Sequence, residues 1–132
     1  MELRRAVVAI TGASAGIGLA CARAFARAGA RLALCARRHE RLDEVARELA
    51  ATGAEVLVAQ VDVADEAQVH GFVKATVERY GRLDVLVNNA GYGLRGRVEE
   101  VPAEGYRRLM EVNYLGTVYG CQAALPVMKA QR

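Results

Sequence analysis

The sequence alternates short apolar runs with segments of helical periodicity, and this alternation sets the narrowest limits on the fold. The apolar runs, rich in Val, Leu and Ala, lie at residues 6–10, 31–36, 56–61 and 83–87. They lack the polar alternation of a half-exposed strand, which predicts strands that are buried on both faces. Segments with helical period separate them, at residues 17–28, 39–52 and 65–80. We therefore expect an α/β protein with a parallel sheet, right-handed crossovers and helices on both faces.

Glycines end all three of these predicted helices, at Gly29, Gly53 and Gly81. Glycine tolerates the left-handed backbone that commonly follows a helix, so these positions support the predicted boundaries. After a loop, residues 102–131 are predicted to form one long last helix, kinked in its final turns by Pro126. The 132 residues are expected to form one doubly wound, nucleotide-binding domain.

The stretch TGASAGIG, residues 11–18, joins the first predicted strand to the first predicted helix. In doubly wound sheets this turn lies where ligands bind, and the free N–H groups and dipole of a helix N-terminus attract phosphate. Gly12 would permit the tight turn, Gly16 the close approach of a pyrophosphate, and Gly18 close packing of helix on strand. The spacing is G-x-x-x-G-x-G rather than the commoner G-x-G-x-x-G, so an ordinary glycine-rich turn is the alternative.

Polar residues also follow the third and fourth predicted strands. Asp62 lies at the binding edge of the sheet, although its local sequence equally fits an exposed turn or helix-capping aspartate. The run Asn88-Asn89-Ala90-Gly91 is a turn signal. Its asparagine amides can either tie neighbouring loops together or contact a cofactor, and both interpretations stay open.

The second predicted strand ends at Ala36, followed by Arg37 and Arg38. A site for NAD favours an acidic group here, which accepts from the ribose 2′-hydroxyl. The planar guanidinium of arginine instead suits a 2′-phosphate, and the hydroxyl of Ser14 is an additional donor. The sequence therefore predicts NADP(H) in preference to NAD(H). The alternative is that both arginines are solvated residues at the start of the next helix, which is more plausible for Arg38.

These motifs, together with Asp62-Val63 and Asn113, resemble in type and order the classical short-chain dehydrogenase/reductase family, over essentially the whole chain. The resemblance implies a Rossmann-type sheet with strand order 3-2-1-4, and hydride transfer between a nicotinamide and a small carbonyl or alcohol substrate. It implies phosphate binding by the glycine loop, adenine contacts from Asp62 and Val63, and a path to the nicotinamide ribose along residues 89–91. The implied cofactor-binding residues are Gly12, Ser14, Ala15, Gly16, Ile17, Gly18, Arg37, Arg38, Asp62, Val63, Asn89, Ala90 and Gly91.

The resemblance also implies a catalytic serine, a Tyr-x-x-x-Lys pair and an asparagine, of which only the asparagine is matched, by Asn113. The chain has one serine, Ser14, and the residues four positions after its tyrosines are Asp84, Gly96, Met110, Val118 and Ala123. In the family the missing residues lie on elements that follow the long helix. We therefore expect the amino-terminal, cofactor-binding half of an oxidoreductase, truncated before strand five and inactive by itself.

Two other functions remain open for such a chain: a non-catalytic dinucleotide-binding module, or an interaction protein. The strand at 83–87 would expose an unpaired edge, and the helix at 102–131 is apolar on more than one face. Both features predict a homo-oligomer that forms through this helix.

Composition and charge restrict the remaining function classes. The 18 Lys and Arg residues exceed the 15 Asp and Glu residues by only three and are interspersed with them, which argues against a nucleic-acid partner. With no signal-like start and no apolar run near the roughly 20 residues of a membrane span, a soluble cytoplasmic protein without a membrane partner is expected. Three scattered cysteines predict reduced, buried thiols, and His39 and His70 lack partners at ligand spacing, so no metal is expected.

Overall fold

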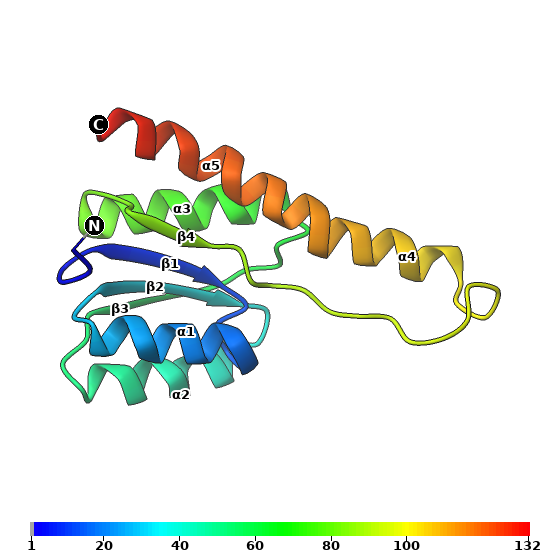
Figure 1. The fold of residues 1–132 in the computed structure, drawn as a ribbon, viewed down its shortest axis with the longest axis horizontal. Coiled ribbons are helices and arrows are strands. Elements are labelled where there is room, and N and C mark those ends of the chain that lie inside the picture. Colours follow the sequence, from blue (N-terminus) through cyan, green and yellow to red (C-terminus); the bar gives the residue numbers. More distant parts are fainter. Residues whose placement is uncertain (1) are drawn as a thin grey trace.

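The computed structural model describes residues 2–132, which form a four-stranded parallel sheet between two layers of helices (Figure 1). Its elements are β1 (Val7–Thr11), α1 (Gly16–Arg27), β2 (Arg31–Ala36), α2 (His39–Ala50), β3 (Val56–Gln60), α3 (Glu66–Tyr80), β4 (Val85–Val87), α4 (Ala103–Met110), the π-helical turn η1 (Glu111–Leu115) and α5 (Gly116–Ala130). The strand order is β3-β2-β1-β4, with every pair parallel. Helices α1 and α2 cover one face and α3 and α5 the other (Figure 1). The expected Rossmann-type order 3-2-1-4 is confirmed.

The two central strands divide their side chains between two cores, because successive residues of a strand point to opposite faces. Val8 and Ile10 of β1 lie in the core under α1 and α2, and Val7 and Ala9 lie in the core under α3 and α5. All five residues of β1 are buried. In β3 and β4, by contrast, most residues are only half-buried. The expectation of burial on both faces is therefore wrong for these strands, since each lies at an edge and pairs with one neighbour.

The glycines that follow the first three helices all have left-handed backbone, with φ of +81° at Gly29, +90° at Gly53 and +76° at Gly81. Gly81 directly caps α3, and its N–H donates to the carbonyl of Val77 at 2.7 Å. At the other end of α3, the side chain of Asp65 accepts from the backbone N–H of Gln68 at 3.2 Å. These helix ends agree with the sequence-based boundaries to within three residues.

The last helical segment is not the single helix over residues 102–131 that the sequence predicts, because backbone hydrogen bonding widens to π-type for one turn at η1. Helix α5 continues through the exposed Pro126 to Ala130, and the kink expected at this proline stays a prediction. Gly116, directly after η1, packs tightly on Val63: a Cβ at position 116 would lie 2.9 Å from Cγ2 of Val63.

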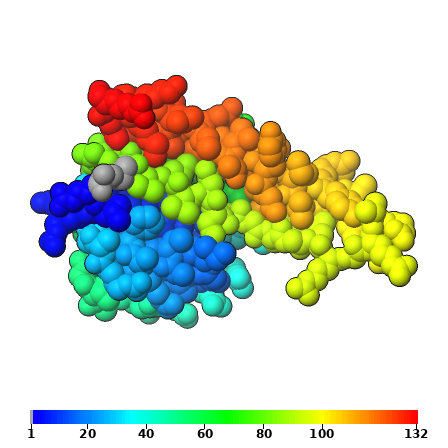
Figure 2. Space-filling view, in the orientation of Figure 1, coloured from blue at the N-terminus to red at the C-terminus, as the bar shows by residue number. Residues whose placement is uncertain are grey.

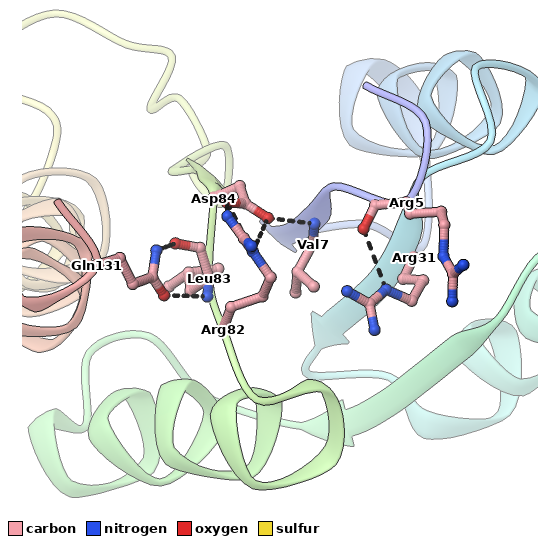
Figure 3. Close-up of polar contacts among 7 residues, drawn as sticks. All are labelled: Arg5, Val7, Arg31, Arg82, Leu83, Asp84 and Gln131. Atoms are coloured by element: carbon pink, nitrogen blue, oxygen red, sulfur yellow. Dashed lines mark hydrogen bonds and ion pairs between the residues drawn. The ribbon is translucent and has the colours of Figure 1, made fainter. Parts of the chain in front are cut away.

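At the amino end of the sheet, polar contacts fix β4 against its neighbours (Figure 3). The carboxylate of Asp84 accepts from the N–H of Val7 at 2.8 Å and pairs with the guanidinium of Arg82. The side chain of Gln131 both accepts from the N–H and donates to the carbonyl of Leu83, each at 2.8 Å. These contacts join β1, β4 and the segment after α5, and so fix the register that brings the loops at the opposite end together.

Residues 91–100 are all exposed and lead into α4. This segment and α4 together project from the rest of the chain (Figures 1 and 2). Among the described helices and strands, α4 packs only against η1. One ion pair ties it to the sheet: Nη2 of Arg108 lies 2.7 Å from Oδ2 of Asp62, just after β3. The position of this projecting segment therefore depends on few contacts.

Candidate functional site

A cleft of about 420 Å³ opens at the carboxyl ends of the strands, between the turn after β1 and the segments after β2, β3 and β4. Parallel strands all end at this edge of the sheet, which brings together residues that are far apart in the sequence. The lining residues are Gly12, Ser14, Ala15, Gly16, Ile17, Ala36, Arg37, Arg38, Val61, Asp62, Val63, Asn89, Ala90, Gly91, Tyr92 and Val112. Every cofactor-binding residue predicted from the sequence is among them except Gly18.

The turn from β1 into α1 leaves a backbone surface that is open to a ligand. Gly12 and Gly16 have left-handed φ of +65° and +55°, and apart from its chain neighbours and the backbone of α1, no atom lies within 4 Å of the point that a Cβ of Gly16 would occupy. No side chain caps the N-terminus of α1, and its first turn has no acidic residue. The positive end of the helix dipole and its free N–H groups therefore suit an anion.

Gly18 is absent from the lining because it serves packing. A Cβ at this position would lie 2.5 Å from Nδ2 of Asn89 and would overlap the carbonyl oxygen of Gly12. The start of α1 thus lies directly against the backbone of the turn. Close packing was expected for Gly18 against the strand, and the structure places it against the turn that follows β1.

A small hydrogen-bond network joins the turns after β1 and β4. The hydroxyl of Thr11 accepts from the N–H groups of Asn89 and Ala90, both at 3.0 Å. In return, Nδ2 of Asn89 donates to the carbonyls of Thr11 and Gly12, both at 3.1 Å. Asn89 therefore ties the two loops together, one of the two roles that the sequence leaves open. Thr11 was not among the site residues predicted from the sequence, although a polar residue at the end of an otherwise apolar strand indicates a polar contact at that edge of the sheet.

The side of the cleft formed by the segment after β2 is basic. Arg37 and Arg38 are exposed, and across residues 2–132 neither guanidinium has a hydrogen-bond or ion-pair partner. Ser14 is only 7% exposed and lines the same cleft. The cleft therefore combines the N-terminus of α1, which suits an anion, with the unpaired guanidinium groups of Arg37 and Arg38.

Asp62 is the one acidic side chain in the lining, and its carboxylate is already engaged. Oδ2 pairs with Arg108, and Oδ1 accepts from the N–H of Ala64 at 3.0 Å, which forms a local turn. Burial by itself raises the pKa of Asp62, but the hydrogen bonds from Arg108 and Ala64 and the charges of Arg108 and Arg37 outweigh it, so the pKa lies below the usual value. The carboxylate is thus held ionised and neutralised by Arg108.

Asn113 does not line the cleft but supports the loop that does. In η1, its Oδ1 accepts from the N–H of Tyr92 at 3.0 Å, and its Nδ2 donates to the Tyr92 carbonyl at 2.7 Å. Gly91 packs against the same side chain, since a Cβ there would lie 3.1 Å from Oδ1 of Asn113. The oxygen and the nitrogen of the Asn113 amide therefore both hydrogen-bond to the backbone of one residue, Tyr92, which lines the cleft.

The cysteines and histidines lie away from the cleft lining. Cys35 is buried and Cys21 half-buried, but Cys121 is exposed on α5, so the prediction of buried thiols is wrong there. The described part of the chain contains no group of three His, Cys, Asp or Glu residues that could hold a metal ion. Nor does any helix within residues 2–132 combine the length and apolar character needed to cross a membrane.

Comparisons with known proteins point in one direction. The family model described as short chain dehydrogenase matches residues 6–132. "Dehydrogenase/reductase SDR family member 7B" of Bos taurus is 41% identical over 136 residues, which cover 98% of this chain and 42% of the relative.

Solved structures are similar over nearly the whole chain as well. A short-chain dehydrogenase/reductase from Burkholderia phymatum in complex with NAD has a TM-score of 0.97 and 34% identity, covering 99% of this chain and 47% of that one. An alcohol dehydrogenase from Thermococcus sibiricus complexed with 5-hydroxy-NADP has a TM-score of 0.91 and 44% identity, covering 95% and 54%. The chain thus spans about half the length of the proteins it matches.

Proposed function

The chain belongs to the short-chain dehydrogenase/reductase family, and we propose that it is the cofactor-binding part of an NADP(H)-dependent oxidoreductase acting on a small carbonyl or alcohol. The observation that carries this proposal is that the open, uncapped start of α1 and the free guanidinium groups of Arg37 and Arg38 line the same cleft. Binding of NADP(H) would use both features, one for its pyrophosphate and one for the 2′-phosphate of its adenosine ribose, whereas NAD(H) would use only the first.

The residues present fit such a cofactor. In the proposal, N–H groups of residues 15–18 hold the pyrophosphate, because Gly16 leaves the backbone open and no carboxylate repels an anion there. The segment at Asp62 and Val63 borders the adenine, and residues 89–91 border the nicotinamide ribose. When bound, the nicotinamide would supply the hydride acceptor or donor.

The preference for NADP(H) rests on charge. At the end of β2, where a carboxylate would favour NAD, the chain has Ala36 and then two arginines. The carboxylate of Asp62, also in the cleft, is neutralised by Arg108. The site therefore keeps a net positive charge toward a 2′-phosphate. The related structures include complexes of both cofactor types, so the arginines of this chain are what support the choice.

A non-catalytic dinucleotide-binding module is the alternative function. One observation favours it: Oδ1 and Nδ2 of Asn113 each make a hydrogen bond to the Tyr92 backbone. Under the main proposal Asn113 is the catalytic asparagine of the whole enzyme. A cytoplasmic location and a homo-oligomer joined through the helical segment at residues 102–131 complete that proposal.

Fluorescence titration of the purified chain with NADPH and NADH tests the proposal. We expect saturable NADPH binding that Arg37→Asp weakens about tenfold or more, because a close charge contact to phosphate is replaced by repulsion, with a smaller effect on NADH. Arg95→Asp makes the same change in net charge at a residue outside the lining and is the matched control. An equal loss for both cofactors would refute the role of Arg37, and no saturation by either cofactor at millimolar concentration would refute the proposed function.

A further inference from the structure

One side chain joins the two phosphate-facing parts of the cleft without lining it. Arg41 is the third residue of α2, and its Nε donates to the backbone carbonyl of Ser14 at 2.8 Å. Within residues 2–132, this is the only side-chain hydrogen bond that connects α2 to the turn at residues 11–18. The bond therefore links the segment that follows Arg37 and Arg38 to the start of α1.

The position of this bond in the turn matters for anion binding. Ser14 directly precedes Ala15, which is the N-cap residue of α1 and lines the cleft. Because a trans peptide unit is planar, the N–H of Ala15 points away from the carbonyl of Ser14. A guanidinium that holds this carbonyl from outside the cleft therefore also fixes the direction of the first N–H group at the start of α1.

Local electrostatics disfavour an arginine at this position. The first turn of α2 is the positive end of its dipole, where a cation is unfavourable, and Arg37 and Arg38 directly precede that helix. Residues that violate a local preference in this way commonly serve a site rather than the element that carries them. The Ser14 carbonyl is the partner that compensates Arg41.

We propose that Arg41 is a positioning residue for dinucleotide binding: it holds the Ser14–Ala15 peptide so that the start of α1 is preset for the pyrophosphate. This inference rests on the proposed function. It makes a distinct claim, however, because the pyrophosphate is common to NADP(H) and NAD(H). Loss of Arg41 should weaken both cofactors by a similar factor, whereas Arg37 acts on the one that carries a 2′-phosphate.

The test compares Arg41→Met with Arg47→Met. Arg47 lies on the same helix, and its Nε also donates to a backbone carbonyl, but to Asp43 of α2 itself at 3.4 Å. Removing one hydrogen bond from a charged donor corresponds to a loss of about tenfold in affinity. We therefore expect Arg41→Met to raise the dissociation constants of both NADPH and NADH about tenfold, and Arg47→Met to leave both unchanged.

A second measurement needs no cofactor. The first hydrogen bond inside α1 joins the N–H of Leu19 to the carbonyl of Ala15 at 3.2 Å. If Arg41 fixes the Ser14–Ala15 peptide, hydrogen exchange at the Leu19 amide should accelerate several-fold in Arg41→Met while amides of β1 keep their protection. Arg41→Lys, which can still donate one hydrogen bond to the Ser14 carbonyl, should restore part of both the protection and the affinity.

The outcomes separate the two proposals. The inference alone would be overturned if the wild-type chain binds cofactor and Arg41→Met matches Arg47→Met both in cofactor affinity and in hydrogen exchange at the Leu19 amide. A loss confined to NADPH would also overturn it, since Arg41 would then act on the 2′-phosphate and not on the turn. If Arg41→Met does not fold, Arg41→Ala takes its place, and wild-type values for affinity and Leu19 exchange in that variant overturn the inference. A wild-type chain that binds neither cofactor refutes the proposed function and the role of Arg41 with it.

Discussion

The substitution Gly18→Ala should destabilise the protein because the added methyl group has no room. Its Cβ would lie 2.5 Å from Nδ2 of Asn89 and 2.9 Å from the carbonyl carbon of Gly12. Asn89 is held by its two hydrogen bonds to the turn after β1. Gly12 is confined in turn, since even a Cβ of its own would lie only 2.8 Å from Cα of Ala90. The start of α1, Asn89 or the turn must therefore move.

Three contributions determine the magnitude. Overpacking of a close contact costs about 1–3 kcal/mol, and a disturbed hydrogen bond of Asn89 adds about 1 kcal/mol. The higher helix propensity of alanine returns about 1 kcal/mol. The free energy of unfolding should thus fall by about 1–3 kcal/mol.

Urea denaturation followed by far-UV circular dichroism measures this change. With an m-value of about 2 kcal/mol/M, a loss of about 2 kcal/mol lowers the midpoint by about 1 M. Gly71→Ala is the matched control, since Gly71 lies within α3, and apart from its chain neighbours and the backbone of that helix no atom lies within 4 Å of the added Cβ. That variant should gain about 0.5–1 kcal/mol. If both substitutions shift the midpoint in the same direction, the packing argument for Gly18 is wrong.

Two further predictions concern pH and thiol reactivity. The hydrogen bond from Arg82, together with that from Val7, holds the pKa of Asp84 below its usual value. The ionised carboxylate therefore stabilises the fold above about pH 4, and this stabilisation is lost as the pH falls through the pKa of the folded state. Asp84→Asn should therefore lower the free energy of unfolding by about 1–3 kcal/mol at pH 7 and by clearly less at pH 3, and a difference from wild type that is independent of pH would contradict the assignment. With a thiol reagent at pH 8, Cys121 should react first and Cys21 more slowly, whereas Cys35, which is buried and has its pKa raised to about 12 by burial, should react only on unfolding. Labelling of Cys35 in the native protein at the rate of Cys121 would refute the packing of β2.

Local signals were sufficient to predict which segments form the sheet and which turns meet at one edge. The apolar runs and terminal glycines define which segments form strands and helices, and the carboxyl ends of parallel strands must share one edge. The turn at Gly16 and the segment at Arg37 could therefore be assigned to that edge from the residues alone. The strand order 3-2-1-4 and the adenine contacts were implied only by the family resemblance, and the residues left the role of Asn89 open between a loop contact and a cofactor contact.

Long-range polar contacts and the π-turn were not predictable in the same way. The ion pair between Arg108 and Asp62 joins residues 46 positions apart, and the contacts of Asn113 with Tyr92 span 21 positions. Such pairs leave no periodic trace in the sequence. A π-turn changes the backbone hydrogen bonding of five residues in an otherwise continuous helical segment, which a search for helical period does not detect.

The network of Thr11 and Asn89 bears on the entropy of binding. Four hydrogen bonds already join the turns after β1 and β4, so these turns have little conformational freedom left to lose. Immobilising a side chain or loop on association commonly costs about 0.5–1.5 kcal/mol per flexible side chain. At these two turns the loss of freedom accompanies folding, whereas the exposed residues 93–100 would still lose conformational freedom if a ligand ordered them. A ligand that contacts only the turns after β1 and β4 should accordingly bind with a smaller entropic penalty than one that must also order residues 93–100.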